Sequence, residues 1–324
     1  MIVVTGAAGL IGSAVVRELN RRGRYDLILV DHLGSSDKWM NLRSLRFAHY
    51  LEKETLLQQL QMGGSSLFGV THIIHLGACS STTEKDASYL IQNNYQYSVR
   101  LAEFATQKGI RMVYASSAAT YGEGNEGFDD DIALLNSLRP LNPYGYSKHI
   151  FDLWLRDRKF DPGFVGIKYF NVFGPNEYHK GDMMSVVLKA FRQIQAEGKI
   201  KLFKSYRTDI RDGEQQRDFL YVEDAAKMTV FLALESQITG VYNAGSGSAN
   251  TWLSLADAIF AAMGKAPQIE FVDMPEWLRP KYQYYTCAPM KRLQSAGFST
   301  PTTPLAEAVK DYVSGYLMKE EARA

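Results

Sequence analysis

The sequence has little of what would point to a membrane, a nucleic acid or the secretory pathway. Its 324 residues include only two cysteines, Cys79 and Cys287, which lie far apart and in no CxxC spacing, as suits a reducing cytoplasm. Lys and Arg total 36 against 35 Asp and Glu, so nothing indicates a basic surface for nucleic acid. No apolar run is long enough for a bilayer, and the first residues resemble a strand rather than a signal peptide. We therefore expect a cytoplasmic protein with no membrane or nucleic-acid partner and no metal.

Short apolar runs alternate with helix-like stretches over the first half of the chain. The expected strands are residues 2–5, 27–30, 71–76, 111–115 and 164–169, and the expected helices are residues 11–22, 52–62, 92–108 and 146–158. Strands that alternate with helices predict a parallel sheet covered on both faces. Ligands of such sheets bind outside the carboxyl ends of the strands.

A glycine-rich turn, GAAGLIG at residues 6–12, follows the first expected strand directly. Gly6 allows the tight turn, Gly9 lets the backbone approach a pyrophosphate, and Gly12 lets the next helix pack closely on the sheet. The start of that helix offers unpaired N–H groups to phosphates. Asp31 ends the second strand, nineteen residues after Gly12. The spacing differs from the GxGxxG form, but the context predicts a Rossmann-type dinucleotide site.

The identity of the dinucleotide stays open at this level. Asp31 favours NAD, because its carboxylate accepts from a ribose 2′-hydroxyl and repels a 2′-phosphate. His32, Lys38 and Lys53 follow on nearby loops and are placed to neutralise a phosphate, which would favour NADP. Solvated surface charge explains these lysines equally well.

Beyond about residue 171 the pattern is less regular. We expect helices at 185–195 and 223–234, strands at 199–203 and 218–222, and a polar, charged loop at 207–216. The fold class predicted is therefore α/β, a doubly wound parallel sheet with a smaller, mainly C-terminal domain. Residues 1–171 and 219–245 would form the dinucleotide-binding domain, and residues 172–218 and 246–324 the substrate-binding domain.

Ser117, Tyr144 and Lys148 form the candidate catalytic group. Tyr144 and Lys148 stand four residues apart, so a helix places them on one face. We expect the lysine ammonium to lower the pKa of the phenol, which can then take a proton from an alcohol while a hydride leaves the same carbon. Ser117, after an expected strand, can hold the substrate oxygen. Each residue alone is common, whereas the combination with the glycine turn is specific.

Several segments carry a family resemblance. RDFLYVED at 217–224 and NAGSG at 243–247 resemble motifs of the extended short-chain dehydrogenase/reductase superfamily. More narrowly, the chain resembles the ADP-heptose 6-epimerases of lipopolysaccharide core synthesis through HLGACSSTTE at 75–84, NNYQYS at 93–98, ASSAATYG at 115–122, YGYSK at 144–148, YFNVFGP at 169–175 and HKG at 179–181. The likeness runs nearly end to end.

This resemblance implies an activity and a set of ligands. The enzyme would invert C6 of ADP-D-glycero-D-manno-heptose to the L-glycero form, by transient oxidation to a ketone and re-reduction. NADP would stay tightly bound throughout, although NAD is not excluded. The resemblance also implies a homo-oligomer, such as a pentamer.

The resemblance further implies particular site residues. It places the pyrophosphate against Gly6, Gly9, Leu10, Ile11 and Gly12, and the adenosine ribose among Asp31, His32, Lys38 and Lys53. It places the nicotinamide half against Leu76, Gly77, Ala78, Cys79, Ser80, Asn93, Lys148, Val172 and Lys180. It places the ADP-heptose against Asn171, Asp182, Lys189, Phe203, Lys204, Ser205, Tyr206, Arg217 and Tyr282. Tyr144 and Lys180 would be the two acid/base groups, although spacing alone favours a diphosphate contact for Lys180.

Three other functions share this fold. A nucleotide-sugar 4,6-dehydratase needs an additional carboxylate pair near the strand-end serine, where this chain has Ala118 and Ala119. A UDP-hexose 4-epimerase would have the same core triad, but the HKG element and residues 79–84 argue against it. A non-catalytic NAD(P)-sensing protein need not keep Ser117, Tyr144 and Lys148 together. The loop 207–216 looks longer than the family's usual connection, and we interpret it as a surface insertion.

Overall fold

The protein is described by a computed structural model covering residues 1–64, 67–161, 163–279, 282–319 and 323. Its main feature is a seven-stranded sheet in which every neighbouring pair is parallel. In spatial order the strands are β10 (Gly240–Ala244), β6 (Phe164–Tyr169), β5 (Arg111–Ser117), β4 (His72–His75), β1 (Ile2–Thr5), β2 (Leu27–Asp31) and β3 (His49–Glu52). The predicted α/β class is confirmed. The edge strand β3 was not predicted, because its side chains are half-buried and its run is too short to show a pattern.

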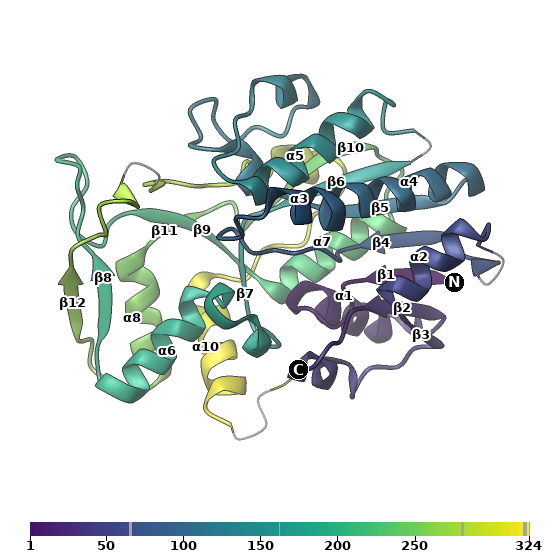
Figure 1. Cartoon of the computed structure of the whole chain (residues 1–324). Helices are drawn as coiled ribbons and strands as arrows, with labels where there is room; N and C mark the ends of the chain where they lie inside the picture. The colour runs from purple at the N-terminus through teal and green to yellow at the C-terminus, as the bar shows by residue number, and fades with distance from the viewer. Residues whose placement is uncertain (65–66, 162, 280–281, 320–322, 324) are drawn as a thin grey trace.

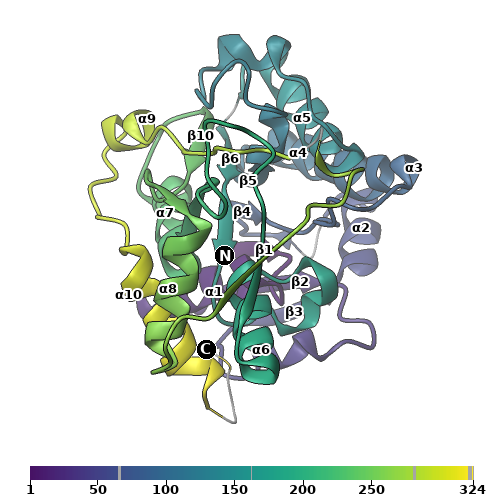
Figure 2. The same ribbon diagram turned by 90° about the vertical axis from the view of Figure 1, so that its left-hand side faces the viewer.

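Both faces of this sheet are buried, as the alternation of side chains shows. Ile2 and Val4 of β1 belong to one core cluster and Val3 to the other. The first cluster contains α1 (Leu10–Arg21) and α7 (Val222–Leu234), which pack against each other. The second contains α2 (Lys53–Gln61), α4 (Tyr97–Lys108) and α5 (Pro143–Arg156). Figures 1 and 2 show the sheet between these two layers.

Smaller elements lie beyond the carboxyl edge of the main sheet (Figure 1). A three-stranded sheet contains β11 (Ala249–Thr251), β9 (Gln216–Tyr221) and β7 (Asn171–Phe173), and a two-stranded sheet pairs β12 (Ile269–Val272) with β8 (Ile200–Phe203). The accompanying helices are α6 (Val186–Glu197), α8 (Trp252–Ala262) and α10 (Leu305–Tyr312). The short α9 (Lys291–Ser295) lies beside β10, and the short α3 (Ala87–Leu90) precedes α4. The chain returns to the main sheet through α7 and β10.

The strand order creates a switch point between β1 and β4. The chain runs outward through β2 and β3 on one side of β1, and through β4, β5, β6 and β10 on the other. Connections after β1 and β4 therefore diverge and leave a crevice, where such sheets bind their ligands. Within the described ranges, no helix is both long and apolar enough to cross a membrane.

Candidate active site

A cavity of about 1430 Å³ lies at this switch point. It is lined by the turns that follow β1, β2, β4, β5 and β6, and on the other side by residues of β7, β9 and α8. A pocket for one small molecule measures about 300–1,000 Å³, so this cavity offers room for two ligands.

The glycine turn forms one end of the cavity as a closely packed cradle. Gly6 has a φ of +68°, and a Cβ there would lie 2.7 Å from the Gly77 nitrogen of the turn after β4. A Cβ on Gly12 would lie 2.0 Å from the Gly6 oxygen. The N-cap of α1, Gly9, has no side chain to bond the first N–H groups of the helix. These N–H groups face the space that a pyrophosphate would need, so the turn fits a dinucleotide.

Asp31 lies next to this cradle at the end of β2, and its carboxylate is already bonded. One oxygen accepts from the Ala8 nitrogen at 2.8 Å, and the other accepts from Lys38 Nζ at 2.7 Å and from the His32 nitrogen at 2.8 Å. Lys38 therefore neutralises the carboxylate where the adenosine ribose was expected. Asp31 and Lys38 line the cavity, whereas the His32 side chain is 67% exposed and lies 3.5 Å from Glu52.

Tyr144 lies in the first turn of α5, earlier in the helix than predicted. The helix begins at Pro143 rather than at residue 146, because Asn142 caps it by accepting from the Gly145 nitrogen at 2.8 Å. Tyr144 and Lys148 consequently share one helical face, both buried and both lining the cavity. Ser117, at the end of β5, also lines it and interacts with the Tyr144 hydroxyl.

The expectation that Lys148 lowers the pKa of Tyr144 is wrong for this structure. Burial raises the Tyr144 pKa, and only the bond with Ser117 opposes that rise. Lys148 instead donates to the Ala115 carbonyl at 2.9 Å, and burial lowers its own pKa to about 8. Burial disfavours the charged form of each group, which raises the pKa of the phenol and lowers the pKa of the ammonium.

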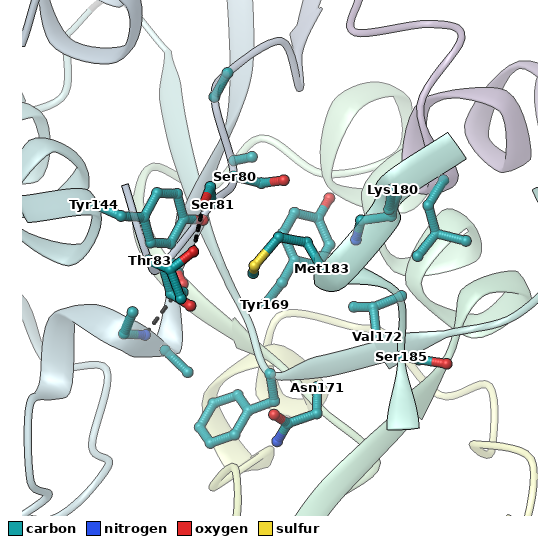
Figure 3. Close-up of a pocket in the computed structure, with 18 of the residues that line it drawn as sticks. Ser80, Ser81, Thr83, Tyr144, Tyr169, Asn171, Val172, Lys180, Met183 and Ser185 are labelled. Carbon is teal, nitrogen blue, oxygen red and sulfur yellow. Dashed lines mark hydrogen bonds between the residues drawn. The ribbon is translucent and has the colours of Figure 1, made fainter. Parts of the chain in front are cut away.

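Lys180 approaches the cavity from the side opposite Tyr144 (Figure 3). It belongs to a 3₁₀ segment, Tyr178–Met183, in which Gly181 has a φ of +52°. Burial lowers the Lys180 pKa, and the nearby Glu177 carboxylate partly opposes this. Glu177 is fully buried and accepts from the Ser185 hydroxyl at 2.6 Å, which ties the 3₁₀ segment to the start of α6.

Arg217 supplies a buried positive charge at the far end of the cavity. Its guanidinium lies 5.1 Å from the Tyr282 ring centre and 5.7 Å from that of Trp252, and all three residues line the cavity. Burial lowers its pKa. Among the described residues, no carboxylate forms an ion pair with it, so the charge is available to an anion.

The cavity brings together most of the predicted site residues. Those that line it are Gly6, Gly9, Leu10, Ile11, Gly12, Asp31, Lys38, Leu76, Gly77, Ala78, Cys79, Ser80, Ser117, Tyr144, Lys148, Asn171, Val172, Lys180, Arg217 and Tyr282. The sequence placed these residues correctly in one region because most of them lie in, or directly after, strands of the two adjoining sheets, while Tyr144 and Lys148 lie on α5.

The other predicted residues lie outside the lining of this cavity. Lys53 Nζ donates to Asn93 Oδ1 at 2.8 Å, and Lys189 Nζ donates to the Asp182 carbonyl at 2.6 Å. The stretch 203–206 lies beside the rim, where the Phe203 ring contacts that of Tyr282 edge-on. Lys204 bonds Asp273, and the Ser205 and Tyr206 nitrogens donate to Asp212 and Tyr284. Their roles remain predictions.

Two features of the site were missed from the sequence. Asn94 is buried and clamps the turn that carries Cys79, accepting from its nitrogen at 2.9 Å and donating to its oxygen at 3.0 Å. Ser81 and Thr83 line the cavity with hydroxyls 3.1 Å apart (Figure 3). The run of serines and threonines after Cys79 was the signal for this hydroxyl-rich wall.

Comparison with known proteins gives the class. Residues 2–245 match the model of the NAD dependent epimerase/dehydratase family. This match spans the main sheet, the glycine cradle and the Tyr144–Lys148 helix. The chain belongs to that family.

Named relatives narrow the class. A protein of Nitratidesulfovibrio vulgaris strain DP4 named ADP-L-glycero-D-manno-heptose-6-epimerase is 48% identical over 318 residues, 98% of each chain. One of the same name from Fusobacterium nucleatum is 42% identical over 99% of each chain. The crystal structure of the Helicobacter pylori protein of that name superposes with a TM-score of 0.81 at 25% identity, covering 97% of this chain and 95% of that one. The resemblance to ADP-heptose epimerases is thereby confirmed.

A further solved structure has a different named activity. Thermus thermophilus UDP-glucose 4-epimerase in complex with NAD superposes with a TM-score of 0.74 at 25% identity, covering 96% of this chain and 97% of that one. The same backbone arrangement thus serves different nucleotide sugars, so the substrate must be argued from the site.

Proposed function

We propose that the chain inverts C6 of ADP-D-glycero-D-manno-heptose through a transient ketone. The observation that carries this proposal is the placement of two ionisable groups, the buried Tyr144 and the half-buried Lys180, on opposite sides of one cavity (Figure 3). Inversion requires the hydride to leave one face of the sugar carbon and return to the other. The ketone oxygen therefore needs an acid/base group in each of two orientations, and one group on each side of the cavity meets that need.

The chemistry follows from the nature of the carbon. A C–H bond beside an alcohol is not acidic enough for direct removal of the proton. A nicotinamide bound in the cavity would supply the alternative, accepting a hydride from C6 and returning it to the other face. Because the oxidation state is restored in each cycle, no second substrate is needed.

Residues of the chain itself carry out the proton transfers. Burial raises the pKa of Tyr144, and the bond with Ser117 opposes that rise and so favours the phenolate. In that form the Tyr144 oxygen takes the proton of the sugar hydroxyl, and Ser117 holds the same sugar oxygen in place. Lys148 donates to the Ala115 carbonyl and keeps two further N–H donors, which suit the hydroxyls of a ribose. Burial lowers the pKa of Lys180, so this lysine can exchange a proton with the ketone oxygen when the sugar lies in the opposite orientation.

Arg217 is the residue we assign to the substrate diphosphate. Its guanidinium lies close to the rings of Trp252 and Tyr282 and donates once to the Gln216 carbonyl, and its remaining donors suit phosphate oxygens. The nucleotide would then extend along Tyr282 toward residues 203–206.

We assign NADP as the cofactor because Lys38 neutralises Asp31. With Lys38 Nζ 2.7 Å from the carboxylate, a ribose 2′-phosphate does not meet an uncompensated negative charge. The lysine also offers a donor for the phosphate.

Purified protein mixed with ADP-D-glycero-D-manno-heptose tests the proposal. NMR should show inversion at C6 without added cofactor, and mass spectrometry of the denatured protein should identify released NADP. Tyr144→Phe should retain the nucleotide while turnover falls by about 10²–10⁴-fold. UDP-glucose serves as the comparison substrate and should remain unchanged at C4. A folded, nucleotide-loaded protein that leaves C6 unchanged would refute the proposal.

A further inference from the structure

Behind the cavity, a buried polar network joins α5 to strands β5 and β6. Asp152 of α5 and Lys168 of β6 are both fully buried, with 3.0 Å between Oδ2 and Nζ. The Asp152 carboxylate also accepts from the Tyr114 hydroxyl at 2.8 Å and from the Ser116 hydroxyl at 2.7 Å. Lys168 donates in addition to the Thr120 hydroxyl. The network thus links three elements through one carboxylate.

Stability alone does not account for this network. Desolvating two charges cancels much of their attraction, and apolar residues of similar volume often stabilise a core equally well or better. The hydrogen bonds from Tyr114, Ser116 and Thr120 offset part of the desolvation. What the ion pair supplies beyond packing is a fixed geometry, because each polar atom has a defined partner.

The network lies directly beside the residues proposed to do the chemistry. Ser116 immediately precedes Ser117 at the end of β5. Asp152 follows Lys148 by four residues on α5, which is one helical turn. The carboxylate therefore sits where the strand that carries one functional residue meets the helix that carries the others.

We propose that Asp152, supported by Lys168, is a positioning residue of the active site. It fixes the end of β5 against α5, and so sets the location of Ser117 relative to Tyr144 and Lys148. The expected effect of this positioning role on turnover rests on the proposed function.

The same carboxylate also acts on Lys148 electrostatically. Burial lowers the Lys148 pKa to about 8, and Asp152 partly opposes this because its carboxylate favours the charged ammonium. The other titratable groups facing Lys148 are Cys79 from the turn after β4, His75 of β4, and Tyr144 on its own helix. Cys79 acts in the same direction as Asp152, and the buried His75 is neutral at pH 7, with a pKa lowered to about 3.

Two variants separate geometry from charge. The double variant Asp152→Asn/Lys168→Met replaces the ion pair with neutral groups of similar size, and we expect kcat to fall by about tenfold or more with KM little changed. The Lys148 pKa should fall as well. Ser116→Ala removes one of the two bonds from β5 to the carboxylate, the one beside Ser117, and keeps the charge of Asp152. We expect kcat to fall while the Lys148 pKa stays the same.

A matched control is Ser236→Ala. Ser236 is also a buried serine, bonded to Arg111 and to the Leu232 carbonyl, but it does not line the cavity. This variant should change neither kcat nor the Lys148 pKa. Should the double variant fail to fold, Ser116→Ala with wild-type kcat would overturn the proposal.

The Lys148 pKa provides a readout that needs no substrate. It can be followed by NMR titration of lysine-labelled protein, with the Lys148→Arg variant identifying the resonance. A folded double variant with wild-type kcat and wild-type Lys148 titration would overturn the inference. Wild-type protein that fails to convert the sugar, while the Lys148 titration shifts as expected in the double variant, would refute the proposed function and leave intact the electrostatic effect of Asp152 on Lys148.

Discussion

The Tyr144 phenol and the Lys180 ammonium enter one cavity from opposite sides, the first from the start of α5 and the second from the 3₁₀ segment that precedes α6 (Figure 3). The two groups come from different layers of the molecule. Tyr144 is buried and Lys180 is half-buried, and burial raises the pKa of the phenol and lowers the pKa of the ammonium.

Lys180 can act as an acid/base group or only as a phosphate contact, and two substitutions distinguish these roles. Lys180→Arg keeps the charge but cannot exchange a proton near neutral pH. If Lys180 transfers a proton, both Lys180→Arg and Lys180→Met should lower kcat by about 10²-fold or more. Steady-state kinetics provides the measurement, and a Lys180→Arg variant with near wild-type kcat would restrict this residue to binding.

Lys148 should impose an alkaline limit on activity. Burial lowers its pKa to about 8, and the ammonium form is the one that donates to a ribose. We therefore expect kcat/KM to fall by about tenfold per pH unit above that pKa. Lys148→Arg, which stays charged, should lose this limb even if its activity is lower. A wild-type profile that stays flat to pH 10 would contradict the assignment.

Lys148 should also make the free energy of unfolding depend on pH. Its folded-state pKa of about 8 lies below the ordinary 10.5, so between these values the unfolded chain binds more protons than the folded one. The free energy of unfolding therefore rises with pH across this window. Lys148→Met should remove that slope in denaturant unfolding measured from pH 7 to 10.5, and an unchanged slope would show that other groups cause it.

Lys38 should decide between the two nicotinamide cofactors. Its Nζ lies 2.7 Å from Asp31, where it neutralises the carboxylate. Lys38→Ala exposes that negative charge to the 2′-phosphate, so affinity for NADP should fall by about tenfold or more while affinity for NAD changes little. Calorimetric titration of nucleotide-free protein measures both constants. Equal losses for the two nucleotides would indicate a structural role.

The glycine cradle should tolerate a methyl group at one position and not at another. A Cβ on Gly12 would meet the Gly6 oxygen at 2.0 Å, whereas a Cβ on Gly9 would meet the same atom at 3.2 Å. Gly12→Ala should therefore separate α1 from the turn and release the bound nucleotide, measured as the absorbance of nucleotide per protein. Gly9→Ala should have the smaller effect, and the reverse order would contradict this packing.

The sequence predicted the main sheet and most of the cavity because both depend on local patterns. Apolar runs such as residues 2–5 alternate with helices, and the glycine turn marks where the first strand ends. Strand ends in a parallel sheet converge on one edge, so residues that follow them meet in space. This is why Gly6, Ser117 and Tyr144 could be grouped from the sequence alone.

What the sequence did not predict depends on tertiary contacts. Burial, rather than Lys148, dominates the Tyr144 pKa, and burial is not visible in a spacing of four residues. The ion pair between Asp152 and Lys168 joins a helix to a strand, with no local signal for either partner. The positions of residues 203–206 depend on how the two-stranded sheet packs beside Tyr282.

The central claim is that C6 is inverted by removal and return of the same hydrogen atom. Conversion of ADP-D-glycero-D-manno-heptose in D₂O, followed by NMR without added cofactor, tests this directly. We expect inverted product that retains protium at C6. Incorporation of deuterium at C6, or no inversion by folded, nucleotide-loaded protein, would contradict it.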